Sequence, residues 1–148
     1  MDVSFSLAMP GEAPTIPLVR RLVGDLLRGL GADGECVADL LIALSEACTN
    51  AVEHARGDYE IDGLVDGEWC RLRVSDWGTG ASEASLTPDR GDLAESGRGI
   101  RIMRALVDDL RIDPAPDRGT VVHLRKRLTW RDETALRRLG RSLIRSAG

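Results

Sequence analysis

The sequence predicts an α+β fold in two layers, with helices packed on one face of a mixed, mostly antiparallel sheet. Three observations predict it: a strand-like alternation near the start of the chain, two long amphipathic helical patterns after it, and two adjacent strand patterns joined by a tight turn. Helices and sheets with one apolar face each bury these faces against one another. The 148 residues are enough for one such domain with its own core.

The composition argues against several classes of protein. The net charge is -4 and the isoelectric point is about 5.2, whereas a protein that binds nucleic acid over its surface is usually basic. Aromatic residues make up only 3% of the chain, so side chains that stack on bases are scarce. No apolar stretch approaches the roughly 20 residues that span a bilayer. We therefore expect neither nucleic acid nor a membrane as a direct partner.

The cysteines and the single lysine argue against several kinds of metal and nucleotide site. Cys36, Cys48 and Cys70 are odd in number and lack the C-x-x-C spacing of zinc sites. A reduced, cytoplasmic setting fits this pattern. Lys126 is the only lysine and follows no glycine-rich phosphate loop. This excludes a P-loop and a eukaryotic-type protein kinase, because both need a lysine on the phosphates.

The first part of the chain is predicted to form one strand and two helices. Residues 3–7 alternate between apolar and polar side chains, as in a half-buried strand. A first helix is expected over residues 16–31, with Thr15 as a possible N-cap, and a second over about residues 34–55. Apolar residues at helical spacing give the second helix its buried stripe: Val37, Leu40, Leu41, Leu44, Cys48 and Val52.

Two adjacent strands are expected over residues 59–65 and 69–75. Asp66-Gly67 lies between them, and this dipeptide is typical of tight hairpins. Alternation along the second strand places Cys70, Leu72 and Val74 on one face and Trp69, Arg71 and Arg73 on the other.

The second half of the chain is less regular. Residues 81–96 show no clear period, and we expect them to form a loop that acts as a lid. Gly99 is expected to open a third helix, and residues 113–119 a turn before a final strand. The stripe of the third helix is Ile100, Met103, Leu106, Val107 and Leu110. We expect one domain over residues 1–128, extended by a helix over residues 129–148 whose basic face is solvated or binds a partner.

Glu46 and Asn50 lie four residues apart, so on a helix their side chains stand one turn apart on the same face. Taken alone, this pair is an ordinary solvated polar face. Asn50 offers a carbonyl oxygen, a ligand type that Mg²⁺ accepts. Glu46 offers a carboxylate that can take a proton from an attacking hydroxyl.

Three further stretches contain glycines: one follows a predicted strand, one opens a helix and one opens a strand. Asp76 ends a predicted strand, and its carboxylate can accept a hydrogen bond from an exocyclic amine, while Gly78 and Gly80 let the backbone approach a flat base. The alternative is a strand that ends in a glycine turn. Gly97-Arg98-Gly99 at a helix start presents bare amides to anionic oxygens, with Arg98 as a candidate phosphate contact or a solvated side chain. Gly119-Thr120 opens the final strand.

Together these stretches resemble the sequence boxes of the GHKL ATPase superfamily, in the right order and over roughly residues 5–127. Residues 46–50 resemble the N-box, residues 76–80 the first glycine box, residues 97–99 the second and residues 119–120 the third. The strings LSEACTNAVEHA at residues 44–55 and SGRGIRIM at residues 96–103 are most similar to the anti-sigma-factor serine kinase branch of that superfamily.

This resemblance implies a histidine-kinase-like, Bergerat-type ATP-binding domain that uses ATP and Mg²⁺. It implies Glu46 as general base and Asn50 as the magnesium ligand. The ATP-binding residues that it implies are Asn50, Asp76, Gly78, Gly80, Gly97, Arg98, Gly99, Ile100 and Thr120. Asp76 would bind the adenine amine, and Thr120 would belong to a polar network beside adenine.

The implied activity is phosphorylation of a serine or threonine on an anti-anti-sigma protein with a STAS domain. A kinase of this branch also sequesters a sigma factor, usually as a homodimer. The alternative from a different class is a regulatory protein that holds ATP and a partner without phosphorylating anything. A histidine kinase would need a phosphoacceptor histidine on a helix pair, and neither His54 nor His123 fits.

Overall fold

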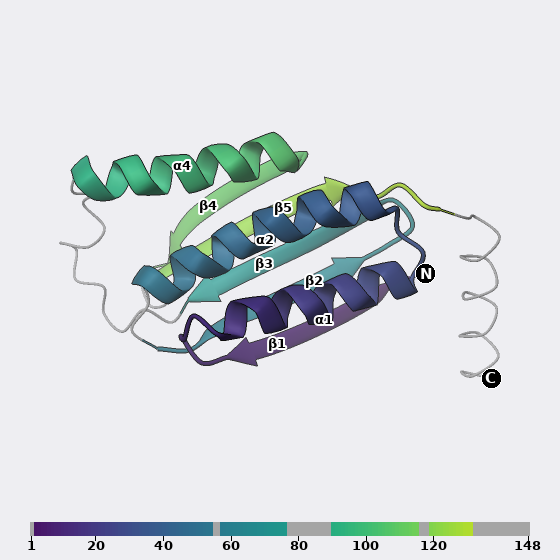
Figure 1. Cartoon of the computed structure of the whole chain (residues 1–148), viewed down its shortest axis with the longest axis horizontal. Helices are drawn as coiled ribbons and strands as arrows, with labels where there is room; N and C mark the ends of the chain where they lie inside the picture. Colours follow the sequence, from purple (N-terminus) through teal and green to yellow (C-terminus); the bar gives the residue numbers. More distant parts are fainter. Residues whose placement is uncertain (1, 55–56, 77–89, 116–118, 132–148) are drawn as a thin grey trace.

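The computed structural model describes residues 2–54, 57–76, 90–115 and 119–131 (Figure 1). These residues form helices that cover one face of a five-stranded sheet. The elements in chain order are β1 (Val3–Met9), α1 (Thr15–Gly29), α2 (Gly34–His54), β2 (Tyr59–Val65), β3 (Trp69–Asp76), α4 (Arg90–Leu106), β4 (Asp109–Ala115) and β5 (Gly119–Arg127). The predicted two-layer α+β fold is confirmed.

The strands follow the order β1-β2-β3-β5-β4, and each neighbouring pair is antiparallel. The sheet is therefore antiparallel throughout its described strands rather than mixed. β3 lies at its centre between β2 and β5, while β1 and β4 form its two edges. The other face of the sheet is not covered by these helices (Figure 1).

The core lies between the helices and the sheet. The predicted alternation of β3 is confirmed, because Cys70, Leu72 and Val74 are buried while Arg71 and Arg73 are exposed. The stripe of α2 is also buried, apart from Val52, which is only partly covered. The largest fully buried side chains come from both layers: Leu27, Leu40, Leu44, Tyr59, Ile61, Leu72, Met103 and Leu124.

The predicted start of the third helix at Gly99 is wrong. The helix α4 already begins at Arg90 and ends at Leu106, while Leu110 belongs to β4. Residues 90–98 contain few apolar residues, so the amphipathic period that marks a helix is absent from them. The part of the expected lid over residues 90–96 is thus helical, and residues 81–89 lie outside the described residues.

The N-cap predicted at Thr15 is also wrong. Pro14 precedes α1 without any side-chain cap, and Thr15 is the first helical residue. The Thr15 hydroxyl lies 2.6 Å from the backbone oxygen of Glu12 and 2.6 Å from the Tyr59 hydroxyl. Because a hydroxyl has one proton to give, Thr15 donates to Glu12 and accepts from Tyr59. This contact ties the start of α1 to β2.

The hairpin between β2 and β3 has one residue more in its turn than a two-residue loop, because residues 66–68 separate the strands. The side chain of Asp66 closes this turn: its Oδ1 accepts hydrogen bonds from the backbone N–H groups of Glu68 at 2.8 Å and Trp69 at 2.7 Å. These bonds lower the pKa of Asp66, because they favour the charged carboxylate.

Lys126 joins the sheet to two helices. Its Nζ donates a hydrogen bond of 2.8 Å to the backbone oxygen of Leu106, the last residue of α4, and lies 3.9 Å from a carboxylate oxygen of Asp39 on α2. A cation at a helix C-terminus satisfies an unpaired carbonyl and interacts favourably with the helix dipole. Lys126 therefore helps to fix α4 beside α2.

Residues 128–131 continue along the body of the domain. Leu128 is buried, the Thr129 oxygen accepts a bond of 2.7 Å from the Asp33 amide, and the indole N–H of Trp130 donates to Gly67 at 2.9 Å. Of the helical extension predicted over residues 129–148, residues 129–131 are not helical, and residues 132–148 lie outside the described residues. No helix in the described ranges is long and apolar enough to cross a membrane.

Candidate functional site

Glu46 and Asn50 lie on the side of α2 that faces α4. Both side chains are half-buried. A Cβ atom built on Gly99 of α4 would lie 3.2 Å from Oε2 of Glu46 and 3.9 Å from both side-chain polar atoms of Asn50. The face that sequence reasoning left open to solvent is therefore partly covered by the backbone of α4. A carboxylate and an amide are held side by side there, and both offer oxygen ligands.

Gly97 and Gly99 occupy the interior of α4 rather than its first turn. The prediction that they present bare amides at a helix start is wrong for this structure, because interior amides of an α-helix bond to the carbonyl four residues earlier. The two glycines also differ from each other. Gly99 is buried against Glu46, whereas a Cβ on Gly97 would have no heavy atom within 4 Å among the described residues.

Asp76 at the end of β3 meets Thr120 near the start of the neighbouring strand β5. Asp76 is only 7% exposed. Its Oδ1 accepts a hydrogen bond of 3.2 Å from the backbone N–H of Thr120. Gly119 has a φ of 76°, a left-handed conformation that favours glycine, and it precedes that N–H. The third and first glycine boxes are thus in contact through the backbone of Thr120.

The remaining predicted ATP-binding residues belong to neither of these two contacts. Gly78 and Gly80 lie outside the described residues. Arg98 is exposed on α4, and Ile100 is half-buried beside the core. The structure therefore brings Glu46, Asn50 and Gly99 together in one place and Asp76 and Thr120 in another.

Cys48 and Cys70 are buried in the core, as their predicted apolar faces indicate, and Cys36 is buried as well. Burial raises the pKa of both Cys48 and Cys70 to about 12, because the thiolate is poorly solvated there. A thiol with such a pKa is not a nucleophile at neutral pH. Within the described residues no cluster of three or more histidine, cysteine, aspartate or glutamate side chains is arranged to hold a metal ion.

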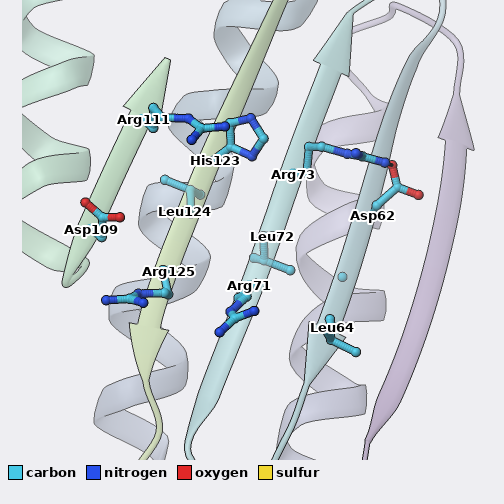
Figure 2. Close-up of a pocket in the computed structure, with 11 residues that line it drawn as sticks. Asp62, Leu64, Arg71, Leu72, Arg73, Asp109, Arg111, His123, Leu124 and Arg125 are labelled. Atoms are coloured by element: carbon cyan, nitrogen blue, oxygen red, sulfur yellow. Dashed lines mark hydrogen bonds and ion pairs between the residues drawn. The ribbon is translucent and has the colours of Figure 1, made fainter. Parts of the chain in front are cut away.

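A hollow of about 350 Å³ lies on the face of the sheet that the helices leave open (Figure 2). Strands β2, β3, β4 and β5 line it, and its charged residues are Asp62, Arg71, Arg73, Asp109, Arg111 and Arg125. Arg73 pairs with Asp62 at 3.1 Å, and Arg125 stacks over the ring of Trp69 at 4.3 Å. The sheet separates this hollow from Glu46, so it is not part of the same site. Sequence reasoning placed Arg71 and Arg73 on one face but did not find the hollow, since four strands must be aligned to form it.

Comparison with known proteins gives a consistent set of matches. A family described as the histidine kinase-like ATPase domain matches residues 9–126. The anti-sigma F factor of Bacillus licheniformis is 27% identical over 139 residues, which cover 87% of this chain and 92% of that protein. The serine-protein kinase RsbW of Halalkalibacterium halodurans is 30% identical over 142 residues, covering 88% and 86%.

A solved bacterial structure has a similar fold. It contains the RsbU and RsbW domains of a Mycobacterium tuberculosis protein, and the similarity has a TM-score of 0.64 at 26% sequence identity. It covers 85% of this chain and 32% of that one. The described site residues, from Glu46 to Thr120, all fall inside the region that the family matches.

Proposed function

This chain belongs to the family of histidine kinase-like ATPase domains, and we propose that it is an ATP-dependent serine/threonine protein kinase that acts as an anti-sigma factor. Relatives named anti-sigma F factor and serine-protein kinase RsbW support both halves of this proposal, and they favour the kinase over a non-catalytic ATP-binding regulator. The observation that carries it is the half-buried Glu46 carboxylate beside the Asn50 amide, with Gly99 packed against both.

Glu46 acts as the general base. A carboxylate within reach of a serine or threonine hydroxyl accepts its proton as the oxygen attacks the γ-phosphorus of ATP. The bond between that phosphorus and ADP breaks, and ADP is the leaving group. Asn50, one turn further along α2, is the residue that would hold Mg²⁺, through its carbonyl oxygen. Mg²⁺ fits this donor set because it prefers oxygen ligands, and when bound it neutralises charge on the phosphates.

Asp76 recognises the base. A carboxylate accepts several hydrogen bonds, so the bond from the Thr120 amide is compatible with one from the exocyclic amine of adenine. We assign Gly78 and Gly80 to the same base pocket and Thr120 to its polar rim. Gly97, Arg98, Gly99 and Ile100 form the phosphate side of the site, where the absence of a side chain on Gly99 brings the α4 backbone close to Glu46.

The name anti-sigma F factor among the relatives supports a sigma factor as one partner. We propose that the phosphoacceptor is an anti-anti-sigma protein with a STAS domain, and that the chain sequesters a sigma factor as a cytoplasmic homodimer. Phosphorylation of the STAS-domain protein would change which partner the kinase holds, and thereby control transcription.

Titration with ATP and Mg²⁺ tests the site, first on the intact chain. We expect micromolar binding, a free energy of about -8 kcal/mol, and its loss in Asn50→Ala and Asp76→Asn. Glu46→Gln should retain binding but lose transfer of labelled phosphate to a purified STAS-domain protein. Glu53→Gln is the matched control, because Glu53 is an exposed carboxylate on the same helix. If Glu46→Gln transfers phosphate as fast as Glu53→Gln, Glu46 is not the base.

A further inference from the structure

Positive charge gathers on the open face of the sheet, although the chain as a whole has a net charge of -4. By the alternation along each strand, Arg71 and Arg73 of β3 and Arg125 and Arg127 of β5 point to this face, away from the helices. We call these four residues the arginine cluster. Three of them line the hollow described above (Figure 2), and Arg127 continues the row along β5.

The strand register brings like charges together in this cluster. Arg71 and Arg125 are direct partners across the pair of β3 and β5. The Cβ atoms of such partners are about 4.5–5.5 Å apart, and like charges directly opposite each other destabilise a sheet. A pair selected for stability alone would set a carboxylate opposite one of them. An anion bound between the two guanidinium groups would offset their repulsion.

The protein does not neutralise most of the cluster. No ion pair joins Arg71, Arg125 or Arg127 to another residue in the described ranges. The guanidinium of Arg125 instead lies 4.3 Å from the ring of Trp69, and that of Arg127 lies 5.8 Å from the same ring. The Nε atom of Arg125 has no hydrogen-bond partner among the described residues either. The cluster is therefore a region of uncompensated positive charge.

We propose that the arginine cluster is a docking site for an acidic, extended segment of a partner protein, which lies along β3 and β5 on the open face of the sheet. The sheet separates this face from Glu46. The inference therefore adds a second binding surface to the molecule and does not depend on the proposed catalysis.

The spacing of the arginines matches that of an extended chain. Arg71 and Arg73 are two residues apart on a strand, as are Arg125 and Arg127, so each pair is spaced by about 6.8 Å. A peptide with an acidic side chain at every second position presents its carboxylates at the same spacing. Each carboxylate can then pair with a guanidinium in a bidentate geometry. Leu64, which is 37% exposed and lies opposite Arg71, offers an apolar contact beside them.

The flanks of the cluster favour a protein segment over nucleic acid. Asp62 of β2 lies opposite Arg73, and Asp109 of β4 lies opposite Arg125, so carboxylates line both sides of the hollow. They would repel a long phosphate backbone that crossed the strands, whereas a short segment parallel to the strands stays between them. The ring of Trp69, which could stack on a base, is already covered by Arg125.

Fluorescence anisotropy of a short labelled peptide, with glutamate at every second position and threonine between, tests the proposal on the intact chain. We expect saturable binding at low salt. Arg71→Gln with Arg125→Gln should raise the Kd at least about tenfold, because two charge-assisted contacts are lost. Arg21→Gln with Arg104→Gln is the matched control, since it removes the same charge from exposed positions on the helices.

A single variant guards against a loss of fold. Arg71 is exposed, and its replacement by glutamine relieves the repulsion with Arg125. Arg71→Gln alone should therefore not lower the melting temperature, and it should still weaken the binding of the peptide. No binding by the intact chain, an equal loss in the two double variants, or no loss in either would overturn the proposal.

Three competitors identify the ligand and its place. A peptide of the same composition with its glutamates adjacent should bind more weakly, and equal binding would overturn the extended geometry. A single-stranded DNA that binds more tightly than the peptide, and loses affinity in the same variants, would replace the protein partner with nucleic acid. ATP should leave the bound peptide in place, because the sheet lies between the two sites. Displacement by ATP would show that the peptide occupies the phosphate side instead, and would overturn the proposal.

Discussion

Replacing Gly99 with alanine should stabilise the protein and weaken its binding of ATP. Gly99 lies in the interior of α4, where glycine costs about 1 kcal/mol relative to alanine. The methyl group of alanine would lie 3.2 Å from Oε2 of Glu46, closer than ordinary van der Waals contact, so that carboxylate would have to move by a few tenths of an ångström. The same methyl group should therefore raise the stability of the protein and lower its affinity for ATP.

The structure sets the size of each effect. A gain of about 1 kcal/mol raises the melting temperature of a domain of this size by about 2–4 °C. Part of that gain is lost to the contact with Glu46, so we expect a rise at the lower end. ATP affinity should fall about tenfold or more, because the methyl group also takes up space beside Asn50, where the metal and phosphates are proposed to bind.

Thermal unfolding and ATP titration, both on the purified chain, measure the two effects. Gly29→Ala is the control, since Gly29 lies in α1, outside the proposed ATP site, and a Cβ atom on it would have no heavy atom within 4 Å in the described structure. It should not lower the melting temperature and should leave ATP binding unchanged. If Gly99→Ala binds ATP as tightly as the intact chain, the contact with Glu46 does not matter and the reasoning fails.

Three further predictions concern stability. Gly63→Ala should cost about 1–3 kcal/mol in urea unfolding, because the new methyl group would overlap the ring of Phe5; no change in the midpoint would contradict this packing. Lys126→Met should cost about 1–3 kcal/mol, since it leaves the last carbonyl of α4 without its charged donor, while Lys126→Arg should restore part of the loss. Stability should be complete below about pH 8.5 and fall as the pH rises towards 12, because the thiols of Cys48 and Cys70 ionise earlier in the unfolded chain than in the core. Unfolding at pH 7.5 and 10 checks this, and a Cys70→Ala variant should be less sensitive to pH.

Short-range sequence patterns predicted most of the strands and helices correctly. The strands β1, β2 and β3 follow from alternation, and α2 from its apolar period, because one face of each is buried in a single core. The start of α4 could not be found in the same way. Its first turns contain few apolar residues, so nothing in the sequence distinguishes them from a loop.

The candidate site was predicted as a set of residues but not as an arrangement. The contact between Gly99 and Glu46 depends on how α4 lies on α2, which sequence spacing does not specify. Thr15 illustrates a related limit. Its hydroxyl could cap a helix, but Tyr59, which follows 44 residues later, offers a competing partner in the folded chain.

Interior and edge strands of this sheet differ in how well they tolerate substitution. Asp76 and Thr120 lie on β3 and β5, two interior strands, and Glu46 lies on a helix that packs over the middle of the sheet. A substitution among them therefore disturbs neighbours on every side. β1 and β4 have a neighbour on one side only. Substitutions there can change which chains associate while the chemistry at the centre is inherited intact. A family with this layout can acquire new partners at its periphery without rebuilding its active site.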